Sequence, residues 1–280
     1  MRARTLDLVA DARARQTAVG AFNIYTLDQA VAVVDAAEAA RSAIILQVHP
    51  GGVGRLLRPL LAGVARIAEA STISVSIQLD HATEIEHARV AIGEGADSIM
   101  ADGSTLQYRE NVALVSRVVQ MAHAQGVAVE GELGRLAGSE DGWTVGELES
   151  SLTNPGEAAR FVASSGVDLL AVCIGNVHGR SRAAVVLDFD RLAAIAQAIH
   201  IPSVLHGASG VPAPAIYRAI DLGVGKININ TEIRAAYLAA IRHDDGSDLV
   251  DALASGRSAV VPTVERIIAG LTRGGSAGPV

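Results

Sequence analysis

Short apolar runs alternate with segments of helical periodicity along most of the chain. Apolar residues repeated every three or four positions indicate an amphipathic helix, whereas short runs rich in Val, Ile and Leu are typical of buried strands. The apolar runs predict strands at residues 18–23, 43–48, 73–80, 97–101, 127–132, 168–174, 202–206 and 225–230. The periodic segments predict helices at residues 27–41, 55–70, 83–94, 109–125, 155–165, 188–199, 212–222 and 231–243.

Capping residues stand at several of the predicted helix ends. Asn154 followed by Pro155 is typical of an N-cap and the first helical position. Gly166 stands where the same helix should end. Thr83, with Glu86 three residues later, has the spacing of a capping box. These local signals predict helix boundaries that agree with the hydrophobic pattern.

The order of the predicted elements indicates the fold. Eight strands that alternate with eight helices predict an α/β protein with a closed (β/α)8 TIM barrel, and an open doubly wound sheet is the alternative. Residues beyond 247 predict an additional C-terminal helix. Because 280 residues is an ordinary length for one such barrel, we expect residues 1–280 to form a single domain.

Polar side chains gather at the predicted C-terminal ends of the strands, which form the rim where TIM-barrel active sites lie. They are Asp80, His81, Asp102, Glu130, Glu132, Asn176, His178, His206, Asn228 and Asn230. Two long stretches without predicted helices or strands, 133–153 and 175–187, also follow strands. Long loops in compact domains are usually functional, so both are expected at the same rim.

Three histidines at this rim predict a metal site. Three neutral imidazoles are a ligand set for catalytic zinc, which leaves a fourth position open for substrate. The candidates are His81, His178 and His206, and the alternative is that they only decorate the barrel end. The other histidines are predicted to lie on the surface or on helices, although His49, in VHPGG, is near the same rim.

A phosphate site is predicted beside the metal site. The segment HGASG (206–210) follows the seventh strand, and NINT (228–231) joins the eighth strand to a helix. Backbone N–H groups at Gly207, Ser209 and the helix start at Thr231 could bind an anion without a lysine. The alternative to a phosphate site is that Gly207 and Gly210 only allow the chain to turn.

Composition restricts the partners. A net charge of −7 and an aromatic content of 3% argue against a nucleic-acid partner, which requires a basic face and stacking side chains. Neither a secretory signal nor an apolar run long enough to span a bilayer is found. A single cysteine, Cys173, suits a reducing compartment. We therefore expect a cytoplasmic protein without a membrane partner.

Several motifs resemble those of one enzyme family in order and spacing. The segments are AFNIYTLD (21–28), LDHATE (79–84), SIMADGS (98–104), VAVEGELGRLAGSED (127–141), NPGEAARFVASSGVDLLAV (154–172), GNVHGRS (175–181), VLHGASG (204–210) and GVGKININTE (223–232). Together, between residues 20 and 235, they resemble the class II, metal-dependent ketose-bisphosphate aldolases of the fructose- and tagatose-bisphosphate type.

The resemblance implies roles for the residues around the metal. His81, His178 and His206 match the ligands of one catalytic Zn²⁺. Asp80 matches the acid/base that handles the proton of the C4 hydroxyl, and Glu140 matches a loop glutamate implicated in proton exchange at C3.

The resemblance also implies further sites. Asp102 and Glu132 match carboxylates around the metal that could hold a second divalent cation, and some members use a monovalent cation near Gly179. Residues that match those binding dihydroxyacetone phosphate are Gly179, Gly207, Ala208, Ser209, Asn228, Ile229, Asn230 and Thr231. The implied partner is a small phosphorylated sugar, and the implied assembly is a homodimer or homotetramer.

Four features depart from the family pattern. Family members commonly have Tyr where Ser181 stands, Lys where Arg182 stands, and MIDAS where this chain reads MADGS. The stretch DDGSDLVDALASG after the eighth predicted helix lacks the Asp-Pro-Arg element that is common there. These positions lie near the pocket that sorts substrates, so the fructose or tagatose identity of the sugar stays open.

Two other functions are consistent with the sequence. Lys226 is the only lysine and could form a Schiff base with a ketone, although its place early in the last strand favours the opposite, stabilising end of the barrel. A non-catalytic phosphosugar-binding or partner subunit of the same fold is the other alternative.

Overall fold

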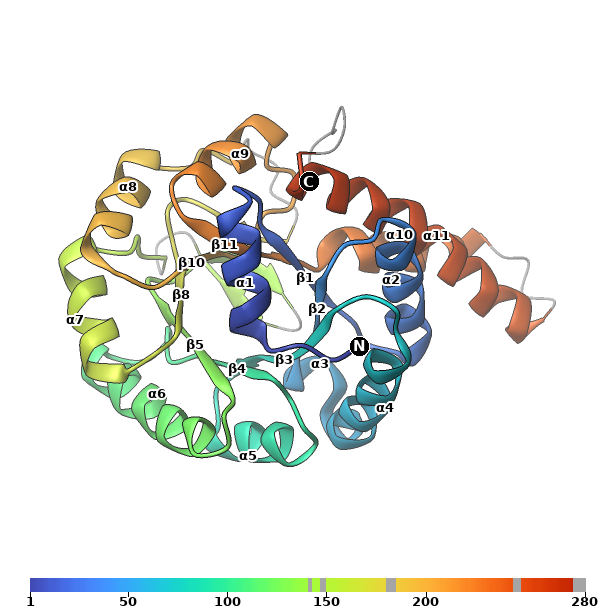
Figure 1. Cartoon of the computed structure of the whole chain (residues 1–280), viewed down its shortest axis with the longest axis horizontal. Helices are drawn as coiled ribbons and strands as arrows, with labels where there is room; N and C mark the ends of the chain where they lie inside the picture. The colour runs from blue at the N-terminus through green and yellow to red at the C-terminus, as the bar shows by residue number, and fades with distance from the viewer. Residues whose placement is uncertain (141–142, 147–149, 180–184, 244–247, 274–280) are drawn as a thin grey trace.

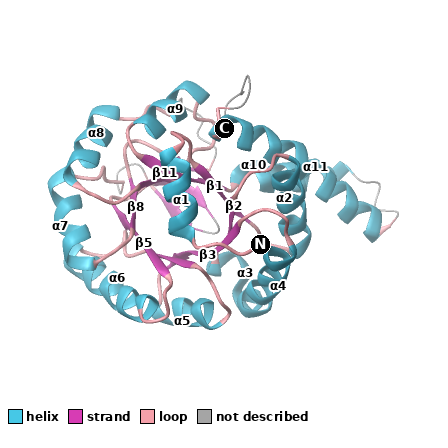
Figure 2. Ribbon diagram, viewed as in Figure 1, coloured by secondary structure: helices cyan, strands magenta, loops and turns pink. Residues whose placement is uncertain are grey.

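The computed structural model describes residues 1–140, 143–146, 150–179, 185–243 and 248–273. Eight parallel strands close into a barrel in the order β1-β11-β10-β8-β5-β4-β3-β2 (Figures 1 and 2). The strands are β1 Val19–Asn23, β2 Ile44–Val48, β3 Val75–Ala82, β4 Ser98–Ala101, β5 Ala128–Leu133, β8 Leu169–Val172, β10 Ser203–Leu205 and β11 Val224–Ile229. The predicted (β/α)8 barrel is confirmed.

Helices surround the barrel in the predicted places (Figure 2). They are α2 Leu27–Ala39, α4 Leu57–Ala70, α5 Ile85–Gly93, α6 Tyr108–His123, α7 Pro155–Ser165, α8 Phe189–Ala198, α9 Ala213–Asp221 and α10 Thr231–His243. The short α3 Pro50–Val53 and the 3₁₀ turn Gly54–Leu56 precede α4. The expected additional helix is α11, Leu249–Leu271, which packs on α10 and α2 and extends to one side of the barrel (Figure 1).

Local capping explains some of the helix ends. The side chain of Asn154 accepts a hydrogen bond from the backbone N–H of Glu157 at 3.0 Å, and α7 ends at Gly166 in the left-handed region with φ 77°. The predicted capping box at Thr83 is wrong, because α5 begins only at Ile85 after an N-cap residue whose side chain makes no capping hydrogen bond.

The barrel interior is filled in layers. At its amino-terminal end, Leu8 and Val9 of α1 (Thr5–Ala14) pack on inward-facing strand residues such as Ile45. Thr5 adds buried hydrogen bonds to the hydroxyls of Ser76 and Ser98, at 2.6 and 2.7 Å. Helix α1 thus closes this end, and it lies across the barrel in Figure 1.

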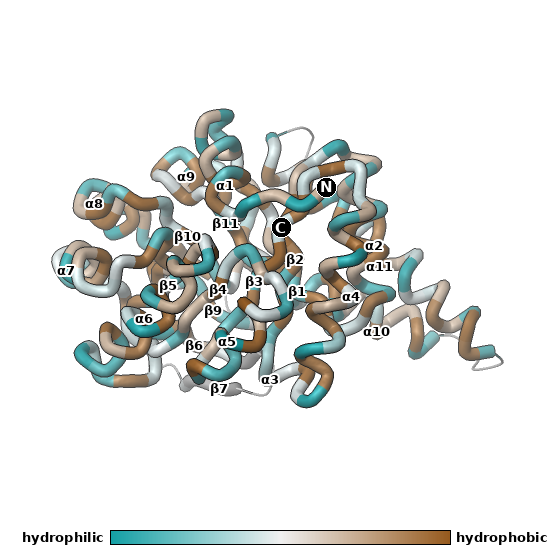
Figure 3. Tube along the Cα trace, turned by 60° about the horizontal axis from the view of Figure 1, so that its bottom comes forward, coloured by the Kyte–Doolittle hydropathy of each residue, from teal (hydrophilic) through white to brown (hydrophobic). Residues whose placement is uncertain are grey.

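A small sheet lies at the other end of the molecule from α1 (Figure 3). It contains β6 Ala137–Glu140, β7 Trp143–Val145 and β9 Val177–His178, with β6 pairing with both others. The stretches 133–153 and 175–187 contain no helix among their described residues, as expected, but the expectation that they are loops missed these three strands. The sheet joins the loops after β5 and β8, and so it helps to position His178.

Two further observations concern burial and membranes. Cys173 is buried, and burial raises the pKa of its thiol to about 11. Within the described ranges, none of the helices combines the length and apolar character needed to cross a bilayer.

Candidate functional site

The centre of the site begins at an irregularity in β3. Neighbouring side chains on a regular strand point to opposite faces, so Asp80 and His81 would normally diverge. The backbone of His81 instead has φ 48°, and the pairing with β4 shifts register between Leu79 and Ala82. This β-bulge ends the regular alternation and lets both side chains contribute to the site.

Three histidine rings meet above the barrel. Their ring centroids lie 5.1 Å apart for His81 and His206, 5.5 Å for His81 and His178, and 6.1 Å for His178 and His206. One nitrogen from each ring lies within 4.8 Å of the others, which is a separation that one metal ion can bridge. The structure therefore brings together the three imidazoles that the sequence selected.

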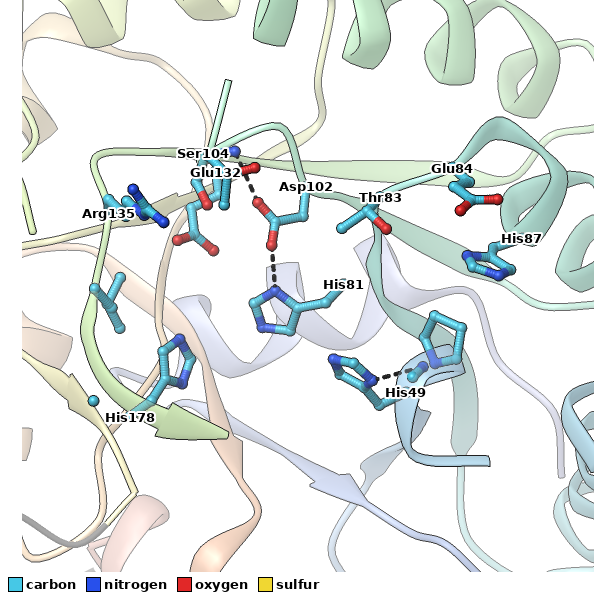
Figure 4. A pocket seen from close by; sticks show the side chains of 15 residues that line it. His49, His81, Thr83, Glu84, His87, Asp102, Ser104, Glu132, Arg135 and His178 are labelled. Atoms are coloured by element: carbon cyan, nitrogen blue, oxygen red, sulfur yellow. Dashed lines mark hydrogen bonds and ion pairs between the residues drawn. The ribbon is translucent and has the colours of Figure 1, made fainter. Parts of the chain in front are cut away.

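His81 is oriented by a carboxylate. Its Nδ1 lies 2.7 Å from Oδ2 of Asp102, and the backbone N–H of Ser104 donates to the other oxygen of Asp102 at 2.9 Å (Figure 4). The ring can therefore present Nε2 toward the other histidines. A carboxylate behind a histidine ligand fixes the tautomer and increases the basicity of the ligand, so Asp102 is placed to support His81.

His206 is also oriented by a carboxylate, but through Nε2, whereas His81 is oriented through Nδ1. Its Nε2 lies 2.8 Å from Oε1 of the fully buried Glu130. Its Nδ1 lies 3.8 Å from Oε2 of Glu132, and neither of these buried atoms has a hydrogen-bond partner among the described residues. Because orphaned buried polar atoms are rare, this pair fits a site for a cation.

His178 is held by close approaches between loops. Gly138 pairs with His178 in the small sheet, and a Cβ atom at Gly138 would lie 2.1 Å from the carbonyl oxygen of His178. A Cβ at Gly207 would lie 2.3 Å from the carbonyl oxygen of Val177. The side-chain amide of Asn176 donates to the carbonyl oxygen of His206 at 2.9 Å. Glycine at both positions is thus required for the loop to reach the other two histidines.

Without a cation, two side chains of this cluster hold protons beyond their usual pH range. Burial lowers the pKa of His81, but the carboxylates of Asp80 and Asp102 outweigh burial and raise this pKa well above its ordinary value. Burial raises the pKa of Glu132 well above its ordinary value, and the charge of Asp102 adds to the effect. Binding of a cation to these side chains therefore requires the loss of protons.

The neighbouring carboxyl groups of Glu130 and Asp102 stay ionised, and the imidazole of His206 stays neutral. Burial opposes ionisation of Glu130 and Asp102, but the ammonium of Lys226 and the imidazole of His206 lower the pKa of Glu130 well below its ordinary value. His81 lowers the pKa of Asp102 in the same way. Burial lowers the pKa of His206, which keeps this imidazole neutral and able to bind a metal.

Asp80 lies beside the histidines and accepts hydrogen bonds from three amides. Its carboxylate accepts from Asn23 Nδ2 at 2.7 Å, Gln47 Nε2 at 3.1 Å and Asn228 Nδ2 at 3.4 Å. The side chain is buried, so this carboxylate is held in one orientation toward the barrel mouth. The arrangement can position an acid/base at a fixed place.

A cavity of about 230 Å³ opens above the cluster, and its walls include residues from several loops. Figure 4 shows His81, Asp102, Glu132 and His178 around it, His49 beside His81, and Glu84 and His87 farther out. His49 lies near the rim as expected, but it is on neither the surface nor a helix. It is buried directly after β2, its Nδ1 accepts from the backbone N–H of Gly51 at 3.0 Å, and its ring lies 5.5 Å from that of His81.

The anion-binding loops are adjacent, because β10 and β11 pair side by side. The side chains of Ala208 and Ile229 pack in the outer core, so only their backbones are available. Ser209 donates a hydrogen bond to Glu232, and Asn230 accepts one from the Tyr25 hydroxyl at 2.7 Å. The loops come together as predicted, although a carboxylate at Glu232 faces the proposed phosphate region.

Three sequence candidates lie partly or wholly outside the described residues. The backbone of Glu140 pairs with Trp143, but its side chain is not described. Ser181 and Arg182 fall outside the described ranges. Gly179 directly follows β9, with φ 75°.

Lys226 does not lie where the sequence suggested. It is fully buried inside the barrel below the histidine cluster, and its Nζ donates to Glu130 Oε2 at 2.8 Å and to Asn228 Oδ1 at 2.6 Å. The early position in the last strand therefore puts this ammonium in the middle of the interior.

Comparison with known proteins identifies the family. The sequence profile of the class-II fructose-bisphosphate aldolases matches residues 3–276. The chain belongs to this family. A structure from Coccidioides immitis, provisionally assigned as a fructose-1,6-biphosphate aldolase, is 32% identical with a TM-score of 0.91, and the match covers 97% of each chain. The YdjI aldolase from Escherichia coli K12 is 31% identical with a TM-score of 0.88, and the match covers 99% of this chain and 100% of YdjI.

A third similar structure supports the fold. The fructose-bisphosphate aldolase of Campylobacter jejuni is 24% identical, with a TM-score of 0.79 over 96% of this chain and 95% of the other. Family membership and the first two structures indicate that the protein is an enzyme, an aldolase. The family is generally metal-dependent, and the described residues contain two groups able to hold a metal: His81, His178 and His206, and His81, Asp102 and Glu132.

Proposed function

We propose that this protein catalyses the reversible aldol cleavage of a ketose phosphate or bisphosphate to dihydroxyacetone phosphate and an aldehyde such as glyceraldehyde 3-phosphate. The observation that carries the proposal is the convergence of His81, His178 and His206 beside the rigidly held Asp80. We propose Zn²⁺ as the ion that the three histidines hold, since neutral imidazoles are its usual ligands.

The chain's own residues account for the proton movements. When bound, the cation supplies Lewis-acid stabilisation of the negative charge that develops as the carbon–carbon bond breaks. Asp80 accepts the proton of the C4 hydroxyl, whose oxygen becomes the aldehyde oxygen. The electron pair of the C3–C4 bond passes to C3, and a proton delivered to C3 completes dihydroxyacetone phosphate. Glu140 is proposed as the source of that proton.

Substrate binding is proposed for the rim beside β10 and β11. Backbone N–H groups of the segment 207–209 and of the start of α10 near Thr231 would bind the phosphate. Asn228, Asn230 and Gly179 would contact the rest of the dihydroxyacetone phosphate unit. Asp102 and Glu132 would bind or support a second cation position.

Two wider properties are part of the proposal. We propose a homodimer or homotetramer in the cytoplasm, acting in carbohydrate metabolism. The exposed Leu249 and Val250 on α11, at 74% and 69% exposure, are available for contacts between subunits.

The proposal is tested by synthesis of a carbon–carbon bond. The zinc-loaded protein is incubated with dihydroxyacetone phosphate and a panel of phosphorylated and unphosphorylated aldehydes, and the ketose products are identified. We expect at least one product and its loss with a chelator. Binding of the metal and of dihydroxyacetone phosphate without any product would favour a non-catalytic binding protein.

The Schiff-base mechanism is tested separately. The paired and fully buried ammonium of Lys226 argues against a nucleophilic amine. We expect borohydride treatment in the presence of dihydroxyacetone phosphate to leave the mass of the protein unchanged. A covalent adduct on Lys226 would contradict the metal-dependent mechanism.

A further inference from the structure

Lys226 is unusual in both composition and position. It is the only lysine among 23 basic side chains, and it is completely buried. Burial of an ammonium is costly unless hydrogen-bonded counter-charges compensate it, so the contacts of Lys226 determine what this buried charge does. Its two hydrogen-bond acceptors, Glu130 and Asn228, each lead to a different part of the proposed active site.

The first branch leads to the metal cluster. Oε2 of Glu130 accepts from Lys226 at 2.8 Å and from Gln78 Nε2 at 3.0 Å, while Oε1 lies 2.8 Å from Nε2 of His206. Both oxygens of this buried carboxylate are therefore fixed. A carboxylate paired with the Lys226 ammonium can only accept hydrogen bonds, so His206 Nε2 donates to it and Nδ1 has its lone pair free for a cation.

The second branch leads to the amide of Asn228. An ammonium group can only donate hydrogen bonds, so the atom of Asn228 that faces Lys226 must be the carbonyl oxygen. The amide nitrogen then points the other way, toward Asp80 Oδ1 at 3.4 Å. Lys226 thereby sets which end of Asn228 faces the barrel mouth, where a donor can reach a substrate oxygen.

We infer that Lys226 is a positioning residue that fixes His206 through Glu130 and fixes Asn228 directly, so that one buried ammonium sets both the metal ligand and the substrate-binding amide. The inference rests on the proposed function, since it assigns a role toward the proposed metal and substrate sites. Arginine cannot replace it, because a planar guanidinium is larger and projects its donors as a fork, whereas the ammonium is a compact point charge.

The test uses Lys226→Met, which keeps the length of the side chain and removes the ammonium. We expect the dissociation constant for Zn²⁺, measured by competition with a chelator, to rise about 10- to 100-fold, as is typical when a group supporting a metal ligand is lost. The visible spectrum of the Co²⁺-substituted variant should also change, since His206 loses its fixed orientation. In the aldol assay with saturating metal, KM for dihydroxyacetone phosphate should rise because Asn228 can rotate.

The matched control is Thr5→Val, which removes buried hydrogen bonds to Ser76 and Ser98 at the opposite end of the barrel. It should lower thermal stability without changing the Zn²⁺ dissociation constant or the Co²⁺ spectrum. If Lys226→Met folds and has the wild-type Zn²⁺ affinity, Co²⁺ spectrum and KM, the inference is wrong. If the two variants weaken metal binding equally, the effect is general destabilisation and the inference is also wrong.

Lys226→Met leaves the charge of Glu130 unpaired, which is a reason for this variant not to fold. A second variant covers that case. Lys226→Met/Glu130→Gln removes both charges at nearly constant volume, which buried ion pairs usually tolerate. We expect this variant to fold and still to bind Zn²⁺ at least about 10-fold more weakly. Wild-type affinity in the double variant would overturn the inference. Absence of metal binding or turnover in the wild type would instead overturn the proposed function itself, and the inference with it.

Discussion

At the scale of single residues, hydrogen bonds from neighbouring strands hold the carboxylate of Asp80 in one orientation. Three amides donate to its carboxylate from β1, from β2 and from β11, which leaves little freedom for the side chain. A proton acceptor held in this way needs no reorganisation before it acts, and such preorganisation is a large part of enzymatic rate enhancement.

Removing this carboxylate should separate chemistry from metal binding. In Asp80→Ala, we expect kcat for aldol cleavage to fall by roughly 10²- to 10⁴-fold, since general acid/base catalysis contributes about this much. Zinc content, measured by elemental analysis, should stay near that of the wild type because Asp80 is not one of the three imidazole ligands. A variant that loses its zinc would contradict the division of roles proposed for Asp80 and His81.

Removing one of the proposed metal ligands should abolish zinc binding as well as turnover, in contrast to Asp80→Ala. In His206→Ala, we expect loss of both bound zinc and turnover, since two imidazoles would remain of the three. The matched control is His200→Ala, at an exposed histidine outside the cluster, which should keep its zinc. Equal zinc content in His206→Ala and the wild type would show that the metal lies elsewhere.

Metal binding should also depend on pH with a defined sign. Despite burial, the carboxylates of Asp80 and Asp102 raise the pKa of His81 above its ordinary value of about 6.5. A cation that binds His81 must therefore displace a proton even above that pH, and affinity should fall as the pH falls. Calorimetry of the metal-free protein in buffers of different ionisation enthalpy should detect proton release on metal binding. A Zn²⁺ affinity that is constant between about pH 8 and pH 6 would contradict this reading.

At the scale of elements, the short sheet of β6, β7 and β9 has a larger role than its size suggests. It connects two loops that follow different barrel strands, and His178 lies on its third strand. The contact depends on Gly138, whose φ of 110° and close approach to the His178 carbonyl exclude a side chain.

A methyl group at this position should therefore displace a ligand from a distance. In Gly138→Ala, we expect Zn²⁺ affinity to fall at least about 10-fold because the strand that carries His178 must move. The control is Gly126→Ala, where φ is 70° but no heavy atom lies within 4 Å of the added Cβ. That variant should lose about 1 kcal/mol of folding stability and keep its metal affinity. Similar Zn²⁺ affinities for the two variants would rule out this role of Gly138.

The barrel elements were predictable from sequence because each has a strong local signal. The strands are continuous apolar runs, and α7 begins with Asn154 and Pro155, which make the expected cap. Strands such as β7, with three residues, are too short for periodicity to reveal, so the small sheet was missed. The spacing of Thr83 and Glu86 misled because β3 extends to Ala82 and delays the helix.

Within the site, it was easier to predict which residues lie there than which residues they contact. The three histidines are recognisable because each lies at or shortly after the carboxyl end of a predicted barrel strand, and strand ends converge in a barrel. The partners of Lys226 could not be predicted, since its contact with Glu130 joins strands 96 residues apart in sequence. One signal was available: inward-facing positions alternate, so Lys226 shares a face of β11 with Asn228. His49 carried a similar signal, because it directly follows β2 at the rim.

At the scale of the whole molecule, the barrel separates stability from chemistry along its axis. The end closed by α1 is apolar apart from a small hydroxyl cluster, the middle contains the network around Lys226, and the titratable cluster lies at the other end. This division is typical of TIM barrels, whose amino-terminal face serves stability.

The division can be tested at the closed end. Val9 of α1 is fully buried against the strands, and Val9→Ala should destabilise the fold by about 2 kcal/mol through lost apolar burial and a small cavity. Thermal unfolding should move down by several degrees, whereas Zn²⁺ affinity and KM should stay unchanged. A marked change in either would show that the two ends of the barrel are coupled.

The bulge at His81 has a consequence for how this protein can diversify. Asp80 and His81 are neighbours in the chain, so the peptide bond fixes the distance between their Cα atoms, and the positive φ of His81 turns both side chains toward the site. Changes in the surrounding loops can therefore reshape the cavity while this pair stays on the barrel strand that carries it. An insertion of a single amino acid between the two residues would instead turn one of the two side chains away from the site.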